Sequence, residues 1–281
     1  TITLGTPTDP TTCGGTDGTI PLTFTNVPDG AYTLSSTFGA LPINVTAGAG
    51  TVTGLAQGVY DDITITVAGC TSIEDIDVTL TDPAIPEIFI VGSTDPATCG
   101  GTGTIDLTFN NVADGTYTID HSSGTFPGVT VTAGAATVNA VAGTYTDLSI
   151  TIANCTSIED PDVTLTDPAL PTITLGVPTD PTTCGGTDGT IPLTFTNVPD
   201  GAYTLGSTFG ALPINVTAGA GTVSGLVQGV YDDITITISG CVSAEDIDVT
   251  LTDPAFPTIN LGAPTAHKPF GGKECTIPFT F

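Results

Sequence analysis

The chain has 281 residues, a formal net charge of −27 and only 11% charged residues, and its cations are Lys268 and Lys273. Nucleic acids and anionic membrane surfaces bind clustered cations, so this composition argues against both as partners. No apolar run approaches the roughly 18 residues of a membrane span, despite a mean hydropathy of +0.32. We therefore expect no membrane insertion.

A short segment sets the repeat of the chain. It starts at Cys13 as Cys-Gly-Gly-Thr-Asp-Gly-Thr-Ile-Pro-Leu-Thr-Phe, returns in a shortened form at Cys99 and unchanged at Cys184, and a degraded copy closes the chain. Fixed spacing of this kind indicates tandem modules. We predict modules at residues 1–85, 86–171 and 172–257 and a partial fourth module at 258–281. Because the chain starts with neither Met nor a signal peptide, we expect a processed product or a segment of a longer protein.

Short apolar runs separated by turn residues make up the first module. The alternation of Ile20, Leu22 and Phe24 with polar residues is typical of a strand with one buried face. Helical periodicity is absent, so we predict tandem immunoglobulin-like β-sandwiches of roughly 86 residues, end to end in a rod. The expected strands are residues 1–4, 19–25, 31–35, 42–46, 51–55, 59–67 and 77–81.

A tyrosine follows a Gly-x pair near the start of the penultimate strand in every module. These residues are Tyr60, Tyr145 and Tyr231. The position suits a tyrosine-corner hydrogen bond, and it equally suits a ring that packs at the rim of the core.

The cysteines point to disulfides. Six of the seven recur at equivalent positions of the three modules, without a CxxC motif or clustered His, which favours a disulfide framework in an oxidising compartment over a zinc site. We predict one bond per module between two loops at the same pole, worth roughly 4 kcal/mol in the chain-entropy model. We also expect a secreted or surface-exposed protein. The predicted pairs are Cys13 with Cys70, Cys99 with Cys155, and Cys184 with Cys241.

Each module ends in the motif Asp-Pro-Ala-x-Pro. Proline fixes its own φ and restricts the residue before it, so we expect the motif to be extended and stiff. The apolar residue x, which is Ile85, Leu170 or Phe256, should fill the joint between modules. The linker prolines are Pro83, Pro86, Pro168, Pro171, Pro254 and Pro257.

No pattern indicates catalysis. His121 stands where the other modules have Ser35 and Gly206, so we interpret it as an exposed loop residue. We expect no enzyme activity and no cofactor.

Acidic clusters recur in every module, for example Asp61-Asp62 and the linker residue Asp82. They favour solvated negative faces, and calcium at the module joints is the alternative. Three N-glycosylation sequons, at Asn44, Asn154 and Asn215, leave attached glycans open.

The partial fourth module predicts a partner for its strands. A lone strand pair is marginal in water, and Ile277, Phe279 and Phe281 would lie exposed. Either the chain continues in a longer protein, or this segment is an inter-subunit strand that pairs with another chain and builds a filament by self-association.

Several of these motifs resemble one known family. A Cys before an Asp-Gly-Thr-Ile strand, a Gly-x-Tyr opening a later strand, a Gly-Cys end to that strand and a final strand running into Pro are similar to the SprB-type repeat of large bacterial surface adhesins, including adhesins used in gliding. In the first module these residues are Cys13, Asp17 to Ile20, Gly58 to Tyr60, Gly69-Cys70 and Val78 to Pro83. The resemblance implies a long, repetitive protein at the bacterial cell surface.

Two hypotheses of function follow. The first is a structural subunit or shaft of an extracellular bacterial filament or adhesin, in which stiff linkers transmit force. The alternative is a ligand-binding adhesin module that recognises glycan or protein through the loops at one pole.

Overall fold

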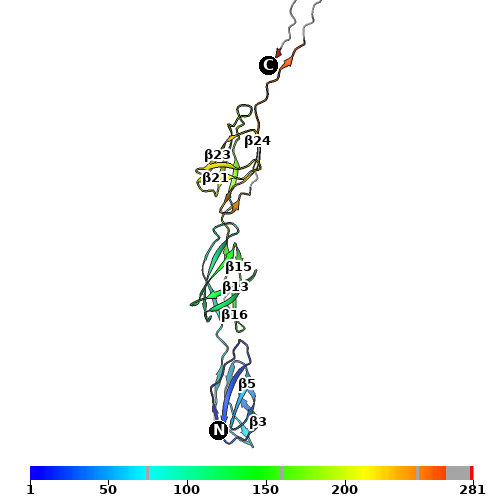
Figure 1. The fold of residues 1–281 in the computed structure, drawn as a ribbon. Helices are drawn as coiled ribbons and strands as arrows, with labels where there is room; N and C mark the ends of the chain where they lie inside the picture. The colour runs from blue at the N-terminus through cyan, green and yellow to red at the C-terminus, as the bar shows by residue number, and fades with distance from the viewer. Residues whose placement is uncertain (74–75, 159–160, 245–246, 264–278, 281) are drawn as a thin grey trace, which may run out of the picture. The chain divides into compact units, whose positions relative to one another are not determined.

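The computed structural model describes residues 1–73, 76–158, 161–244, 247–263 and 279–280. Every regular element that these residues form is a β-strand, which confirms the predicted all-β class. The strands surround three separate hydrophobic cores, and we call the three parts sandwich 1, sandwich 2 and sandwich 3 (Figure 1).

The strands of each sandwich follow one another in the chain. Sandwich 1 contains β1 (Ile2–Leu4), β2 (Gly18–Phe24), β3 (Gly30–Ser36), β4 (Gly39–Val45), β5 (Ala49–Leu55), β6 (Gly58–Tyr60), β7 (Thr66–Val67), β8 (Cys70–Thr71) and β9 (Val78–Leu80). Sandwich 2 contains β10 (Glu87–Thr94), β11 (Thr102–Asn110), β12 (Gly115–His121), β13 (Gly124–Val131), β14 (Ala135–Val141), β15 (Gly143–Tyr145), β16 (Ser149–Ile152), β17 (Cys155–Thr156) and β18 (Val163–Leu165). Sandwich 3 contains β19 (Thr172–Leu175), β20 (Gly189–Thr196), β21 (Gly201–Leu205), β22 (Leu212–Val216), β23 (Ala220–Leu226), β24 (Gly229–Ile234), β25 (Thr237–Ile238), β26 (Cys241–Val242) and β27 (Ile247–Leu251). The short strands β28 (Asn260–Leu261) and β29 (Phe279–Thr280) follow.

The strand pairing defines an immunoglobulin-like sandwich. One layer has the order β1-β2-β5, repeated as β10-β11-β14 and β19-β20-β23. The remaining strands form further sheets, which in sandwich 2 have the order β13-β12-β16-β17 and the pair β15-β18. All of these pairings are antiparallel, as expected for neighbouring strands joined by short turns.

Alternation of side chains places the core. In β2, Ile20, Leu22 and Phe24 are buried, whereas Thr23 between them is exposed. The register sets Ile20 opposite Val52 on the same face, and both are fully buried. Burying a side chain of this size stabilises the fold by about 1.5 to 3 kcal/mol, so the pattern read from the sequence also carries much of the stability.

One predicted strand is interrupted. Residues 59–67 do not form a continuous strand, because β6 ends at Tyr60 and Asp62 adopts a left-handed φ of 56°. The chain resumes as β7, turns through Ala68 and Gly69, and returns as β8. The β7–β8 hairpin was not predicted, and it carries Cys70.

The tyrosine-corner hydrogen bond is present in all three sandwiches. The hydroxyl of Tyr60 donates to the carbonyl of Ala56 at 2.8 Å, and Tyr145 and Tyr231 donate to carbonyls four residues upstream at 2.9 Å. The hydrogen bond and the packed ring, posed above as alternatives, occur together: Tyr60 is fully buried. Its hydroxyl therefore has a partner without leaving the core.

By the density of its contacts the chain separates into two units. The first comprises residues 1–96 and 101–166, and the second comprises residues 97–100 and 167–281. The short loop 97–100, which is part of sandwich 2 in sequence, is thus grouped by its contacts with the second unit. The predicted module boundaries and the end-to-end rod stay predictions.

Candidate functional site: disulfide joints between sandwiches

The two disulfides found among the described residues connect consecutive sandwiches and do not close a loop within any of them. Cys13 of sandwich 1 is bonded to Cys155 of sandwich 2, and Cys99 of sandwich 2 is bonded to Cys241 of sandwich 3, each across 142 residues of sequence. Cys70 and Cys184 are free. The predicted pairs Cys13–Cys70, Cys99–Cys155 and Cys184–Cys241 are therefore wrong.

The predicted pairing fails because the two cysteines of a sandwich lie at opposite poles. Cys13 lies beside the linker, with its Sγ 3.8 Å from the carbonyl oxygen of Pro83, where the chain leaves sandwich 1. Cys70 instead lines a groove together with Thr1 and Thr25, where the chain enters. A disulfide allows Cα atoms to be at most about 7 Å apart, so cysteines at opposite poles cannot be joined.

The first half of each joint is a glycine loop held by the linker aspartate. In sandwich 1, Gly14 adopts a left-handed φ of 66° directly after Cys13, a conformation that glycine reaches without steric cost. Its N–H donates to Oδ2 of Asp82 at 2.8 Å. In sandwich 2, Gly100 donates to Oδ1 of Asp167 at 3.3 Å in the same way. The carboxylate thereby fixes the direction in which the cysteine points.

The second half of each joint is a two-residue hairpin turn. The turn Ala153-Asn154 has two left-handed residues, with φ of 51° and 58°, and it places Cys155 at the start of β17. Two positive φ angles are typical of the type I′ turn, whose twist matches that of paired strands. The turn Ser239-Gly240 presents Cys241 with the same geometry.

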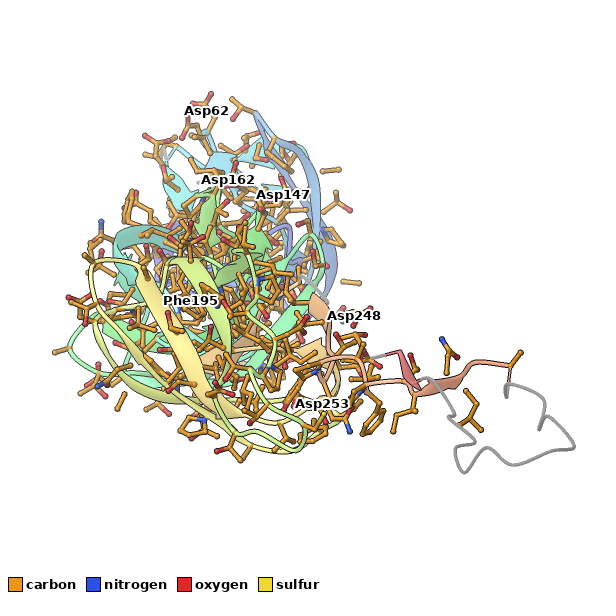
Figure 2. All side chains as sticks on the ribbon, turned by 90° about the horizontal axis from the view of Figure 1, so that it is seen from above. Asp62, Asp147, Asp162, Phe195, Asp248 and Asp253 are labelled. Atoms are coloured by element: carbon orange, nitrogen blue, oxygen red, sulfur yellow. A yellow bond between two sulfur atoms is a disulfide. The ribbon has the colours of Figure 1, made fainter. Side chains whose placement is uncertain are left out.

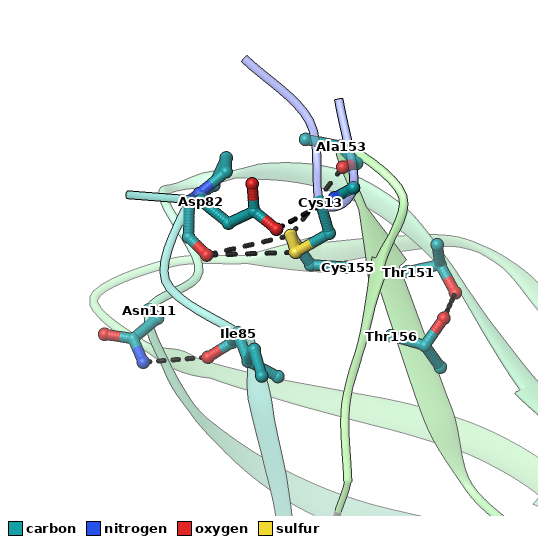
Figure 3. Close-up of a disulfide and its surroundings, with 10 residues drawn as sticks. Cys13, Asp82, Ile85, Asn111, Thr151, Ala153, Cys155 and Thr156 are labelled. Carbon is teal, nitrogen blue, oxygen red and sulfur yellow. Dashed lines mark hydrogen bonds between the residues drawn. A yellow bond between two sulfur atoms is a disulfide. The ribbon is translucent and has the colours of Figure 1, made fainter. Parts of the chain in front are cut away.

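Backbone and sulfur contacts complete the joint between sandwiches 1 and 2 (Figure 3). The N–H of Cys13 donates to the carbonyl of Ala153 at the hairpin tip, at 2.8 Å. The sulfurs of Cys13 and Cys155 each lie 3.8 Å from the carbonyl oxygen of Pro83. Cys155 is only 2% exposed, whereas Cys13 is half-buried, so the joint covers the hairpin side of the bond.

The second joint reproduces these contacts. The N–H of Cys99 donates to the carbonyl of Ser239 at 2.9 Å. The sulfurs of Cys99 and Cys241 lie 3.8 and 3.7 Å from the carbonyl oxygen of Pro168, and Cys241 is also 2% exposed. Both pairs of consecutive sandwiches therefore share one joint design.

The linkers contribute through their backbone and not through the apolar side chain. The amide of Asn111 donates to the carbonyl of Ile85 at 2.8 Å (Figure 3), and Asn197 donates to the carbonyl of Leu170 at 2.9 Å. The side chains of Ile85 and Leu170 are about half exposed, and that of Phe256 is exposed. The expectation that Ile85 and Leu170 fill their joints is therefore wrong, and for Phe256 it stays a prediction because most of the next module lies outside the described residues.

The linker prolines differ between joined and unjoined positions. Pro86 and Pro171, which end the linkers that lead into sandwiches 2 and 3, are buried, whereas Pro257 is exposed. Pro83, Pro168 and Pro254 all place their carbonyl oxygens within 3.8 Å of a cysteine sulfur. The first proline of each linker therefore lies at a cysteine sulfur, and the second is buried in the linkers that lead into sandwiches 2 and 3.

The acidic residues hold backbone turns. Asp77, Asp162 and Asp248 accept from the N–H groups of Asp62, Asp147 and Asp233, and these donors have left-handed φ. Figure 2 labels one of these pairs, Asp147 and Asp162. Among the described residues no three His, Cys, Asp or Glu side chains are grouped as ligands for a metal ion.

Two exposed acids beside the glycine loops have lowered pKa values. The hydroxyl and N–H of Thr11 donate to Asp17, and these hydrogen bonds lower the pKa of that carboxyl. Thr182 lowers the pKa of Asp188 by the same contacts. Both pairs brace the glycine loop that follows the cysteine.

His121 packs against aromatic rings. It ends β12, half-buried, with its ring centroid 4.5 Å from that of Phe126 and 5.1 Å from that of Tyr145. The interpretation of His121 as an exposed loop residue is therefore wrong, because the residue belongs to a strand and is half-buried. In sandwich 1 the corresponding tyrosine, Tyr60, packs against Phe38 at 4.4 Å.

The predicted inter-subunit strand is only partly described. Ile277 and Phe281 lie outside the described residues, while the backbone of Phe279 pairs with Leu261 between β29 and β28. The asparagines of the three glycosylation sequons, Asn44, Asn154 and Asn215, are exposed. In the part of the chain that is described, no helix is long and apolar enough to cross a membrane.

The joints escaped prediction because the hairpin was not recognised. A β-branched residue followed by Ala-Gly-Cys, Ala-Asn-Cys or Ser-Gly-Cys recurs in the three modules, and a small residue followed by Gly or Asn is the signature of a two-residue turn. That signal would have located the turn, although not the partner of its cysteine.

The fold and the joints define a chain of tandem immunoglobulin-like sandwiches linked by disulfides. No family model matches the sequence, and no curated protein matches it either. Among solved structures, the chain is similar to a fragment of titin, domains I67–I69. The match covers 90% of this chain and 99% of the titin fragment, with 11% sequence identity and a TM-score of 0.37.

Two bacterial surface proteins are also similar. The match to the Escherichia coli adhesin FdeC covers 90% of this chain and 96% of the FdeC chain, with 16% sequence identity and a TM-score of 0.27. The match to domains 4–9 of the surface layer protein SbsC covers 94% of this chain and 48% of the SbsC chain, with 13% sequence identity and a TM-score of 0.30. At TM-scores this low the likenesses say nothing about what the chain binds.

Proposed function

We propose that the chain is a structural segment of an extracellular bacterial filament or adhesin shaft, built to carry tension from one sandwich to the next. The observation that carries this proposal is that both disulfides cross a joint between sandwiches. A bond within a sandwich would protect only that sandwich, whereas a bond across the joint keeps neighbours attached even when the linker is pulled.

Composition and compartment support the same function. Disulfides persist in oxidising environments outside the cytoplasm, and Thr- and Gly-rich faces with few charges suit a surface protein that makes close lateral contacts. The resemblance to SprB-type repeats and the adhesin and surface-layer proteins among the similar structures agree with a location at the bacterial surface.

The alternative, a ligand-binding adhesin module, is less well supported. That hypothesis places ligand recognition in the loops at one pole. At the joined poles these loops are engaged in the joint, because Cys155 and Cys241 are buried there and Ala153 and Ser239 accept hydrogen bonds from the neighbouring sandwich.

Surface labelling of the source bacterium tests the proposal. Antibodies raised against the chain should label intact cells and extended material around them in electron micrographs. Label that appears only after the cells are lysed would contradict the proposal.

A further inference from the structure

Among the described residues, the free cysteines Cys70 and Cys184 occupy the positions of the two halves of a joint. Cys70 occupies the repeat position of Cys155 and Cys241, and Cys184 occupies that of Cys13 and Cys99. Sandwich 1 therefore presents an unbonded hairpin, and sandwich 3 presents an unbonded glycine loop. We propose that Cys184 of one copy of the chain forms a disulfide with Cys70 of a second copy, so that the joint within the chain is repeated between chains.

The loop half is already in the joined conformation. Gly185 follows Cys184 with a φ of 69°, against 66° at Gly14. Its N–H donates to Oδ2 of Asp253 at 2.8 Å, the distance found between Gly14 and Asp82 in the joined loop. The Sγ of Cys184 lies 3.6 Å from the carbonyl oxygen of Pro254. No rearrangement of this loop is needed for it to accept a hairpin.

The hairpin half is also preformed. Ala68 and Gly69 have φ of 49° and 83°, and Cys70 pairs with Val67 as Cys155 pairs with Ile152. The hydroxyls of Thr66 and Thr71 lie 2.8 Å apart, the distance found between Thr151 and Thr156 in the joined hairpin. The carbonyl of Ala68 corresponds to that of Ala153, which receives the N–H of Cys13 in the joined state.

The surface around Cys70 is open where its counterparts are covered. Cys155 and Cys241 are 2% exposed, whereas Cys70 and Cys184 are exposed. A groove of about 400 Å³ lies beside Cys70, lined in part by Asn26, Val27 and Ala68. The counterparts of Asn26 in sandwiches 2 and 3, Asn111 and Asn197, hold the linker that leads in from the preceding sandwich. The groove is thus a joint socket, and its fitting occupant is the loop of a further sandwich.

The bond forms by thiol–disulfide exchange with a small disulfide as oxidant, such as glutathione disulfide. The thiolate of Cys184 attacks the glutathione disulfide, forms a mixed disulfide and releases one glutathione. The thiolate of Cys70 from the second copy then attacks the Cys184 sulfur, forms the Cys70–Cys184 bond and releases the second glutathione. The two thiol protons pass to solvent, and the two electrons end on the glutathione.

The proposal deepens the proposed function by naming a second copy of this chain as the partner. It rests on the proposed function because the disulfide needs the oxidising environment outside the cell. The test uses the purified chain, so it is independent of cellular location. Failure of surface labelling would contradict the structural role at the surface, and failure of the test below would contradict only the chain-to-chain joint.

The test follows disulfide-linked multimers in a glutathione redox buffer. The chain carries Cys275→Ser, which removes the thiol outside the described residues, and the buffer contains enough salt to screen repulsion between copies of charge −27. We expect a ladder of multimers on a non-reducing gel that collapses on reduction. Peptide mapping should recover Cys70 linked to Cys184, with the bonds Cys13–Cys155 and Cys99–Cys241 intact.

Two single variants in the same background provide the matched control. The Cys70→Ser variant keeps only the loop thiol, and the Cys184→Ser variant keeps only the hairpin thiol. Mixed together, with one of them labelled with nitrogen-15, they should form a heterodimer in large excess over both homodimers and nothing longer. Each variant alone should stay monomeric.

Three outcomes would overturn the proposal. One is a chain that remains monomeric in the redox buffer while both thiols react with an alkylating reagent and the internal disulfides are intact. Another is a mixture in which the heterodimer merely equals the two homodimers together, as random coupling gives. The third is a Cys70–Cys184 bond found only within single chains.

Discussion

At the scale of single residues, the tyrosine corners show how one side chain serves both core and turn. The ring of Tyr60 is buried beside Phe38, and its hydroxyl donates to the carbonyl of Ala56. Tyr32 makes the same contact with the carbonyl of Pro28 at 2.9 Å. Each of these tyrosines fixes the entry of a strand through a hydrogen bond four residues back.

Removing the corner hydroxyl should destabilise the fold. The Tyr60→Phe variant keeps the ring and leaves the carbonyl of Ala56 without its donor, so we expect the free energy of unfolding to fall by about 1 kcal/mol. Denaturant unfolding followed by circular dichroism measures this loss. Val59→Thr, at the half-exposed neighbouring position, is the control, and an equal loss in both variants would contradict the role of the hydroxyl.

Alkaline pH should act on the same residues. Burial raises the pKa of Tyr60 and of Tyr231, so the folded state binds their protons more tightly than the unfolded state does. Their contribution to stability is complete below the unfolded pKa of about 10 and is lost as the pH rises through the folded pKa. Tyrosinate absorbance should therefore develop at higher pH in the native chain than in the denatured chain. Coincident titrations would contradict this expectation.

At the scale of elements, the hairpin turn is the feature on which each joint depends. Ala153 has a φ of 51°, which is strained for a residue with a Cβ. Its carbonyl accepts the N–H of Cys13, so the strained conformation aims both the acceptor and Cys155 at the neighbouring sandwich.

Substitutions at Ala153 should separate strain from packing. Ala153→Val adds β-branching at a left-handed position, and we expect it to lower the free energy of unfolding by 1 kcal/mol or more, on the order of the cost of such a conformation. Ala153→Gly removes the strain and should be neutral or stabilising. Chemical denaturation of both variants, with the disulfides confirmed by peptide mapping, gives the comparison. A valine variant as stable as the glycine variant would show that the turn is not strained.

At the scale of the whole molecule, the disulfides overlap in sequence. The loop closed by Cys13–Cys155 contains Cys99, whose own bond reaches Cys241. Each bond closes 142 residues, and a loop of that length is worth about 5 kcal/mol in the chain-entropy model. The stability of one sandwich is thereby coupled to that of the next.

Cysteine substitutions should distinguish disulfides between sandwiches from disulfides within a sandwich. The double variant Cys13→Ser, Cys155→Ser should lose about 5 kcal/mol of stability. Cys70→Ser should stay within about 0.5 kcal/mol of the parent chain, since it changes an exposed, unbonded residue. Urea unfolding measures both, and a large loss for Cys70→Ser would contradict the observed connection.

Mechanical extension gives a second whole-molecule prediction. Because the two bonds overlap, only residues 99–155 can extend between Cys13 and Cys241 while both bonds are intact. Reduction of both bonds should therefore release about 3.5 Å for each residue of 13–99 and 155–241. Single-molecule pulling from the two ends, with and without reductant, measures the released length. Equal extension in both conditions would contradict a load-bearing role for the joints.

The sequence by itself determined the all-β class, the repeat, the buried face of each strand and the positions of the cysteines. Alternation of residues such as Ile20, Leu22 and Phe24 has one structural solution, and the turn residues bound each strand. Only the tertiary structure decided which cysteines are joined. In a tandem repeat, bonds within a module and bonds to the next module place cysteines at the same recurring positions. The choice depends on the poles at which the Cys13 loop and the Cys70 hairpin lie, and those poles are set by a hairpin and a left-handed Asp62 that interrupt a strand predicted to be continuous.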